Sequence, residues 1–217
     1  MTKAQILALL QGTLITLELT LVSIAIGIVL AFIIAFLRMS KNKALKGLGW
    51  AYIWIFRGTP LLLQIMVIYF AIPIMFREAF GNTLLMPMFT AAVLAFTLNT
   101  AAYIAEIIRA GIESIDIGQM EAAKALGMSY SQAMIKVIIP QTFKRLLPPF
   151  SNEFIMILKD TSLISVIGMA ELMKVSRQFA ANGDWGFYFY AGAIYLFLTT
   201  IFSVGFDKLE KFAGRYE

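Results

Sequence analysis

The chain of 217 residues is 60% apolar and 14% charged, with a formal net charge of +5 at pH 7. Soluble domains are about 45–50% apolar and about 25% charged, so this composition leaves too little polar surface for a water-soluble body and predicts an integral membrane protein. The absence of cysteine and histidine excludes disulfides, Cys/His zinc sites and histidine-based catalysis.

Five membrane-spanning helices are predicted, in a single transmembrane domain that covers residues 1–217. A span needs about 20 mostly apolar residues. The expected spans are, in chain order, Thr13–Leu37, Ala51–Phe76, Pro87–Ile108, Phe150–Met169 and Phe187–Phe206. The first is longer than the apolar core of a cleavable signal peptide, so we expect it to remain as a span.

The first span carries small residues at every fourth position. They are Ser23, Gly27, Ala31 and Ala35. Four residues make just over one helical turn, so these residues share one face on which another helix can approach closely.

Lysine and arginine concentrate in the loop after the first span, the connection after the third span and the C-terminal tail. These regions hold Arg38, Lys41, Lys43, Lys46, Arg57, Arg109, Lys124, Lys136, Lys144, Arg145, Lys208, Lys211 and Arg215. Positive loops stay in the cytoplasm, so they explain the net charge without nucleic-acid binding. The sequence predicts a multi-pass protein of a bacterial inner membrane, with the N-terminus outside and the C-terminus and residues 110–149 cytoplasmic.

The cytoplasmic segment Glu121–Pro140 is predicted to form two short helices joined by a tight turn. It opens with strong helix formers, and Gly127 suits the left-handed position just past a helix end. Ser129 followed by Gln132 matches a capping box that starts a second helix. The segment is too short and polar to cross the bilayer, so we expect it to dock into a groove of a partner protein.

This segment resembles the EAA motif of ABC-importer permeases. The motif positions are matched by Glu121, Ala122, Ala123, Gly127, Val137, Ile139 and Pro140, with Val137 and Ile139 where Ile and Leu are more usual. In that family the segment is the coupling helix that inserts into the nucleotide-binding subunit. Segments Arg57–Gln64, Ala105–Ile112 and Lys159–Leu163 are similar to segments of polar amino-acid permeases, and the resemblance covers nearly the whole chain.

The resemblance implies an all-α fold of the type I ABC importer permease, with five transmembrane helices and a cytoplasmic coupling segment. It also implies partners: a dimer of ATPase subunits, a second permease copy or a related permease, and an extracytoplasmic amino-acid-binding protein. ATP and Mg are then bound by the ATPase subunits. This chain has no phosphate-binding loop, and we expect it to bind no cofactor or metal and to catalyse no covalent reaction.

Two carboxylates fall inside the fourth span. Glu153 and Asp160 are seven residues apart, which is two helical turns, and therefore share a face. A charge near the bilayer centre costs at least about 2.5–3.5 kcal/mol, so such residues mark functional sites. A cavity with two carboxylates favours a cation, and every amino acid offers an ammonium group. The alternative is that each carboxylate pairs with a cation of the protein.

Further polar residues in the spans are candidate substrate contacts. Thr161 and Ser162 could hold a substrate carboxylate at a helix interruption, with hydrogen bonds inside the helix as the alternative. Asn99 and Tyr103 share a face of the third span, where packing between helices is the alternative. Gln64 is a candidate in the second span.

The acidic pair predicts that the transported amino acid is basic, similar to arginine, lysine or histidine. The resemblance to ABC-importer permeases implies that transport proceeds by alternating access. Importers of glutamine, glutamate and cystine share the same motifs and stay as alternatives. A secondary carrier, a channel or an intramembrane enzyme is a remote alternative, because none of them needs a coupling segment.

Overall fold

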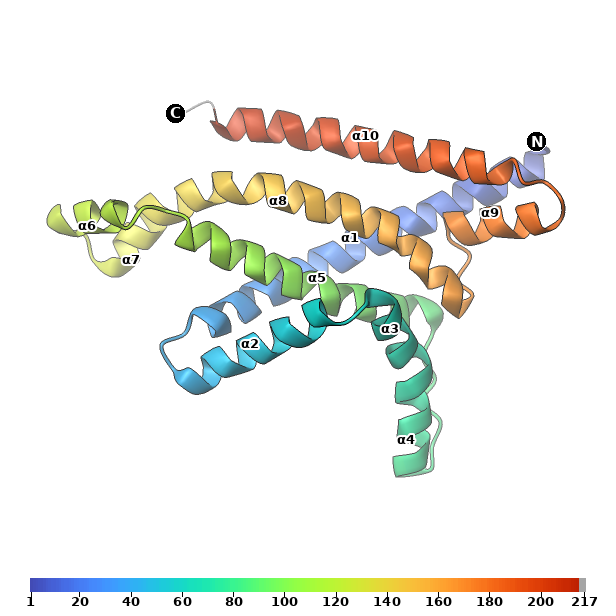
Figure 1. Ribbon diagram of the computed structural model, residues 1–217, viewed down its shortest axis with the longest axis horizontal. Coiled ribbons are helices and arrows are strands. Elements are labelled where there is room, and N and C mark those ends of the chain that lie inside the picture. The colour runs from blue at the N-terminus through green and yellow to red at the C-terminus, as the bar shows by residue number, and fades with distance from the viewer. Residues whose placement is uncertain (215–217) are drawn as a thin grey trace.

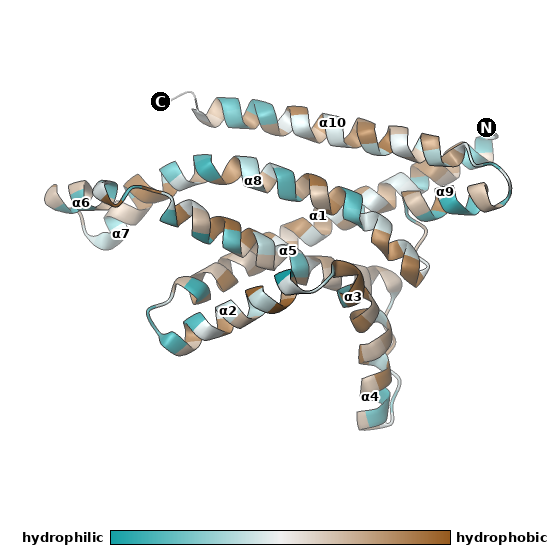
Figure 2. Cartoon of the chain, in the orientation of Figure 1, coloured by the Kyte–Doolittle hydropathy of each residue, from teal (hydrophilic) through white to brown (hydrophobic). Residues whose placement is uncertain are grey.

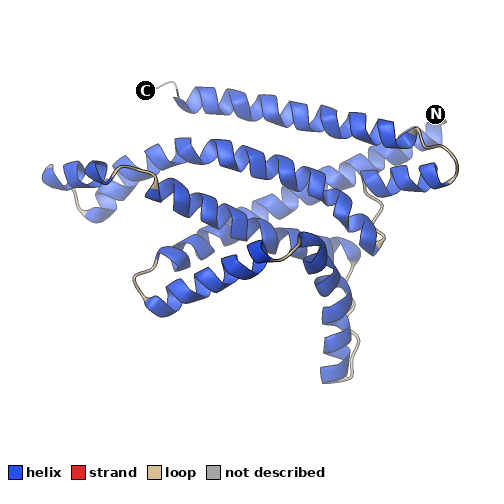
Figure 3. Cartoon of the chain, in the orientation of Figure 1, coloured by secondary structure: helices blue, strands red, loops and turns tan. Residues whose placement is uncertain are grey.

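The computed structural model describes residues 1–214, which form helices joined by short turns (Figures 1 and 3). Arg215, expected in the basic tail, lies outside the described residues. The long helices are α1 (Lys3–Met39), α5 (Met88–Glu113), α8 (Ile139–Asp160) and α10 (Phe187–Ala213). The shorter helices and helical turns are α2 (Lys43–Gly58), α3 (Leu61–Met66), η1 (Val67–Ala71), α4 (Ile72–Phe80), α6 (Ile117–Ala125), α7 (Tyr130–Ala133), η2 (Met134–Ile138), η3 (Thr161–Ile167) and α9 (Leu172–Ala181).

Within residues 1–214, four helical stretches are long and apolar enough to cross a membrane. They are α1, the continuous stretch Leu61–Phe80, α5 and α10. Figure 2 shows hydrophobic residues along much of these helices, with polar residues toward their ends, as in α4 and the C-terminal part of α10. The expected span Phe150–Met169 is not among the four, because α8 is polar along much of its length and is followed by the 3₁₀ turn η3. Helix α8 packs against both α5 and α10.

The second span is Leu61–Phe80 and not Ala51–Phe76, because the helix is interrupted at Thr59 and Pro60. Thr59 is extended (φ −122°, ψ 146°), and α3 starts after Pro60. Proline lacks a backbone N–H and pushes the preceding residue out of the helical region, so one helix cannot run through this point. Helix α2 packs back on α1 and α5, whereas α4 projects from the body of the chain (Figure 1).

The small residues of α1 form the expected close helix contact. Ser23, Gly27, Ala31 and Ala35 are all buried. Ala31 and Ala35 pack in a cluster with residues of α5, and a Cβ added at Gly27 would lie 3.1 Å from the Thr100 Cγ2 atom. The prediction of an interhelical stripe is therefore confirmed.

Helices α6 and α7 form the predicted pair joined by a tight turn. Gly127 has φ +80°, and the N–H of Met128 donates to the carbonyl of Ala123 at 3.1 Å, which closes α6 with a Schellman motif. The hydroxyl of Ser129 accepts from the N–H of Gln132, and the Gln132 side chain accepts from the N–H of Ser129. This reciprocal capping box starts α7 as the sequence predicts.

The basic segments gather toward one end of the molecule. Figure 1 shows the α1–α2 turn, the α6–α7 pair and the C-terminal end of α10 on the same side, with the N-terminus and α9 on the opposite side. This arrangement fits the expected grouping of the basic connections.

Candidate functional site

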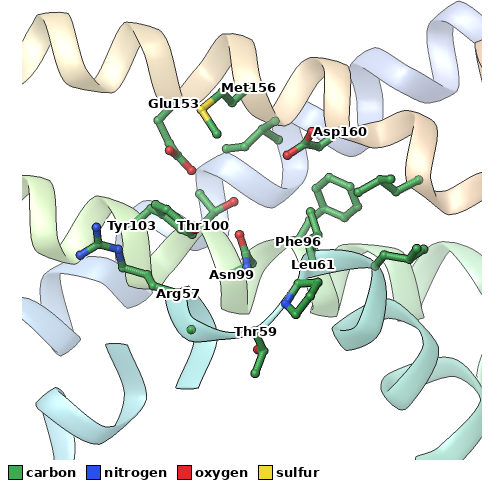
Figure 4. A pocket seen from close by; sticks show the side chains of 15 residues that line it. Arg57, Thr59, Leu61, Phe96, Asn99, Thr100, Tyr103, Glu153, Met156 and Asp160 are labelled. Atoms are coloured by element: carbon green, nitrogen blue, oxygen red, sulfur yellow. The ribbon is translucent and has the colours of Figure 1, made fainter. Parts of the chain in front are cut away.

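A cavity of about 460 Å³ opens between α8, α5 and the break between α2 and α3 (Figure 4). Ligand sites in proteins range from about 300 to 1,000 Å³, so this cavity is large enough for a small metabolite. Its lining residues are Arg57, Gly58, Thr59, Pro60, Leu61, Leu62, Phe96, Asn99, Thr100, Tyr103, Glu153, Met156, Ile157, Asp160 and Leu163.

Helix α8 brings Glu153 and Asp160 to the same cavity, as their spacing predicts. Glu153 is buried and Asp160 half-buried. Within residues 1–214, neither carboxylate forms an ion pair or a hydrogen bond. The alternative of an ion pair with a cation of the protein is therefore not formed by either carboxylate among the described residues, although Arg57 lines the same cavity.

Asn99 lines the cavity from α5, but its amide nitrogen is already engaged. Asn99 Nδ2 donates to the carbonyl oxygen of Phe56 at 3.1 Å and to Gln64 Oε1 at 3.0 Å. Gln64 Nε2 in turn donates to the Phe56 and Thr59 carbonyl oxygens at 2.9 and 3.1 Å, and to Thr59 Oγ1 at 2.9 Å. These carbonyls lie at the α2–α3 break, where helical partners are lost. Gln64 lies behind the cavity wall and supports its shape.

Thr161 and Ser162 do not line the cavity. Thr161 is fully buried, and its hydroxyl donates to the Leu158 carbonyl oxygen at 2.8 Å, which is the hydrogen bond inside the helix that was the alternative. The chain tightens into η3 directly after Asp160, and this change of pitch turns Leu163 rather than the hydroxyls toward the cavity. The geometry gives no support to the predicted carboxylate site at these two residues.

Arg57 is a cavity residue that the sequence reasoning treated only as a basic charge near a loop. Its guanidinium carbon lies 5.1 Å from the centroid of the Tyr103 ring, a distance typical of a cation–π contact. Among the described residues, Arg57 forms no ion pair. The pair Thr59-Pro60, just after Arg57, was the sequence signal that could have identified Arg57 as a cavity residue. A helix that ends there places its last turn, which carries Arg57, in the wall of the cavity.

Charged residues at the far end of α5 pair with one another. Arg109 Nε donates to Glu106 Oε2 at 3.0 Å, and Arg109 also pairs with Glu113. The spacings of three and four residues place these groups on adjacent turns of one helix face. Glu106 therefore has a local cationic partner, unlike Glu153.

The α6–α7 pair and the turn η2 that follows it expose large apolar side chains. Ile117, Leu126, Tyr130 and Ile135 have exposed fractions of 62–81%. The EAA residues Glu121, Ala122 and Gly127 are also exposed, whereas Ala123 is buried. An exposed apolar surface flanked by polar residues is typical of a protein–protein contact.

Comparisons with known proteins agree with this architecture. Residues 23–212 match the family described as binding-protein-dependent transport system inner membrane component. The chain is 42% identical to the arginine transport system permease protein ArgU of Corynebacterium glutamicum over 90% of this chain and 65% of that protein, so it spans less than two thirds of that relative. It is 40% identical to a putative glutamine transport system permease protein GlnP of Rickettsia bellii over 78% of this chain and 75% of that protein.

A solved structure described as an amino acid ABC transporter with histidines has the same fold. It superposes with a TM-score of 0.85 at 40% identity, covering 94% of this chain and 93% of that one. The chain therefore belongs to the family of binding-protein-dependent transport system inner membrane components. Within it, the protein is a permease subunit of the ABC importer type, a transport component and not an enzyme.

Proposed function

We propose that this protein is the permease subunit of an ATP-driven importer for basic amino acids similar to arginine, lysine or histidine. The observation that carries the proposal is the pair Glu153 and Asp160, which share one cavity wall and form no ion pair among the described residues. Two carboxylates in a partly dry cavity stabilise a ligand with two positive groups and disfavour one with a second carboxylate.

The relatives support an amino acid as substrate but differ in which one. Their names refer to arginine and glutamine, and the solved transporter to histidines. The acidic cavity favours the basic members of this set. Glutamine is the second candidate, because a neutral side chain is tolerated beside a carboxylate. Glutamate would bring a second carboxylate of its own beside Glu153 and Asp160, and it is the least favoured.

The proposed mechanism is alternating access. An extracytoplasmic binding protein delivers the amino acid to the cavity, and Asp160 and Glu153 hold its positive groups. The partner ATPase subunits bind ATP and Mg, and the α6–α7 pair passes their movement to α5 and α8, between which it lies in the chain. Two permease copies, or this chain with a related one, surround the path. The N-terminus lies outside and the C-terminus in the cytoplasm, in keeping with the basic connections.

The test uses the assembled transporter with its binding protein. Asp160→Asn and Glu153→Gln are compared with the parent for ATPase stimulation by arginine, histidine, glutamine and glutamate. We expect Asp160→Asn to weaken stimulation by every amino acid, because Asp160 contacts the ammonium group that all amino acids carry. Glu153→Gln should weaken only the basic ones, by about tenfold or more in apparent affinity for a lost charged hydrogen bond.

A matched control is Asp207→Asn, an exposed carboxylate on α10 outside the cavity. This variant should keep the parental substrate dependence. If Asp160→Asn and Glu153→Gln also keep it, the carboxylates do not hold the substrate. If the parent responds to glutamine and not to arginine or histidine, the glutamine alternative replaces the basic one.

A further inference from the structure

A second cavity continues the first along α5. It has a volume of about 330 Å³ and is walled by α5 from Tyr103 to Ser114, with Arg145 and Pro149 from α8 opposite. The first cavity uses the same two helices, from Phe96 to Tyr103 on α5 and around Glu153 on α8.

The two cavities lie on one face of α5. From Phe96 through Tyr103 to Ser114, the lining residues follow at intervals of one or three positions, which is the pattern of a single helical stripe. At 1.5 Å per residue this stripe is about 27 Å long, close to the roughly 30 Å thickness of a bilayer core. The cavities are therefore consecutive parts of one route, whose far end leads to the Ser114 end of α5 and the start of α6.

The two cavities meet at a pair of residues that lines both. Arg57 and Tyr103 are the residues common to both linings, and the Arg57 guanidinium lies over the Tyr103 ring at 5.1 Å. Figure 4 shows Arg57 and Tyr103 side by side at the edge of the first cavity, away from Asp160. One side chain comes from the last turn of α2 and the other from the middle of α5, so the contact joins two helices at the junction of the cavities.

The two cavities differ in charge. Arg57 lines both cavities. The first also holds Glu153 and Asp160, which form no ion pair among the described residues. The second also holds Glu106, which is paired with Arg109, and Arg145, whose Nη1 donates to the carbonyl and hydroxyl oxygens of Ser114, two uncharged acceptors. The second cavity is therefore more basic than the first and retains a basic ligand less well.

We propose that the second cavity is the release half of the substrate path, and that the Arg57–Tyr103 contact is the partition that separates it from the binding cavity. This inference rests on the proposed function. The partition keeps a basic amino acid beside Glu153 and Asp160. Displacement of Arg57 from the ring opens the way to a cavity that retains the cation less well, so release is rapid.

The partition is tested by thiol accessibility, since the chain has no cysteine. A cysteine at Met156 measures access of the reagent to the first cavity. A cysteine at Ala110, introduced in a separate variant, measures access to the second. The assembled transporter in sealed vesicles, without nucleotide, is treated with a small membrane-impermeant thiol reagent. The reagent is applied from the side on which Ala110→Cys reacts, so the assay does not depend on an assumed orientation.

We expect Tyr103→Leu to speed modification of Met156→Cys by about 3- to 30-fold, because the ring that holds Arg57 is lost. Tyr103→Phe keeps the ring face, so the rate should stay within about twofold of the parent. Arg57→Gln should speed the modification of Met156→Cys in the same way as Tyr103→Leu. Because the Arg57 side chain is exposed, its replacement should not disturb folding, so Arg57→Gln serves as the second variant if Tyr103→Leu does not assemble. The rate for Ala110→Cys should not change in any of them.

Equal rates for Tyr103→Leu, Tyr103→Phe and the parent would overturn the partition. Protection of Met156→Cys by arginine in the otherwise parental transporter is measured separately. No protection means that the proposed function fails. Protection without any effect of Tyr103→Leu or Arg57→Gln means that only the partition fails.

Discussion

Asn99 and Gln64 join α5 to α3 through a buried hydrogen bond, in which Asn99 Nδ2 donates to Gln64 Oε1 at 3.0 Å. The same two amides satisfy backbone carbonyls of Phe56 and Thr59 at the break between α2 and α3. A broken helix inside a membrane is tolerated where side chains satisfy its freed backbone groups. This pair of amides therefore fixes the loop that carries one wall of the cavity.

Replacing either amide should destabilise the protein. We expect Asn99→Leu and Gln64→Leu each to cost about 1–3 kcal/mol, because buried carbonyl groups lose their donors. The double variant should cost less than the sum, since both act on one network. Thermal unfolding of the purified transporter measures these costs. Thr97→Val is the control, because the Thr97 hydroxyl has no hydrogen-bond partner among the described residues, and it should be nearly neutral. Strictly additive costs would show that the amides act independently.

Gly12 permits the closest approach of α1 to α9. A Cβ added at Gly12 would lie 3.0 Å from the backbone nitrogen of Leu172 and 3.1 Å from the carbonyl carbon of Glu171. Backbone atoms cannot rotate away as a flexible side chain would. Gly12→Ala should therefore destabilise the protein by about 1–3 kcal/mol, the cost typical of overpacking.

The matched control for Gly12 is Gly47→Ala in α2. Gly47 has no atom within 4 Å of the added Cβ, so alanine there should be neutral or stabilise by about 0.5–1 kcal/mol. The two variants are compared by their thermal midpoints in the same detergent. A Gly12→Ala midpoint equal to that of Gly47→Ala would contradict the close contact.

The turn at Gly127 should be required for coupling to the ATPase partner. Its φ of +80° is costly for a β-branched residue but is accessible to asparagine. Gly127→Val should lower substrate-stimulated ATPase activity of the assembled transporter or prevent its assembly. Gly127→Asn should stay close to the parent. The coupling assignment would be refuted by a Gly127→Val transporter that assembles and responds to substrate like the parent.

The orientation is tested with single cysteines at exposed positions. Asn82 lies between α4 and α5, Asn182 follows α9, and Lys43 begins α2. In intact cells, thiols at Asn82 and Asn182 should react with an impermeant reagent and a thiol at Lys43 should not, because the basic connections are cytoplasmic. The reverse labelling pattern would invert the proposed topology.

The sequence by itself determined the features that depend on neighbours along the chain. The apolar stretches of α1, α5 and α10, the small-residue stripe from Ser23 to Ala35, and the α6–α7 pair with its capping box were all predicted. The shared face of Glu153 and Asp160 was also predicted, because residues seven apart on any regular helix point the same way. Each of these follows from helical periodicity or from a local hydrogen bond.

Only the tertiary structure decided which side chains meet across helices. Gln64 proved to support the α2–α3 break, because its partners are set by the course of the backbone around Pro60. Arg57 and Tyr103 are 46 positions apart, and no periodic pattern connects them. Their contact, and with it the division of the route into two cavities, depends on how α2 packs against α5.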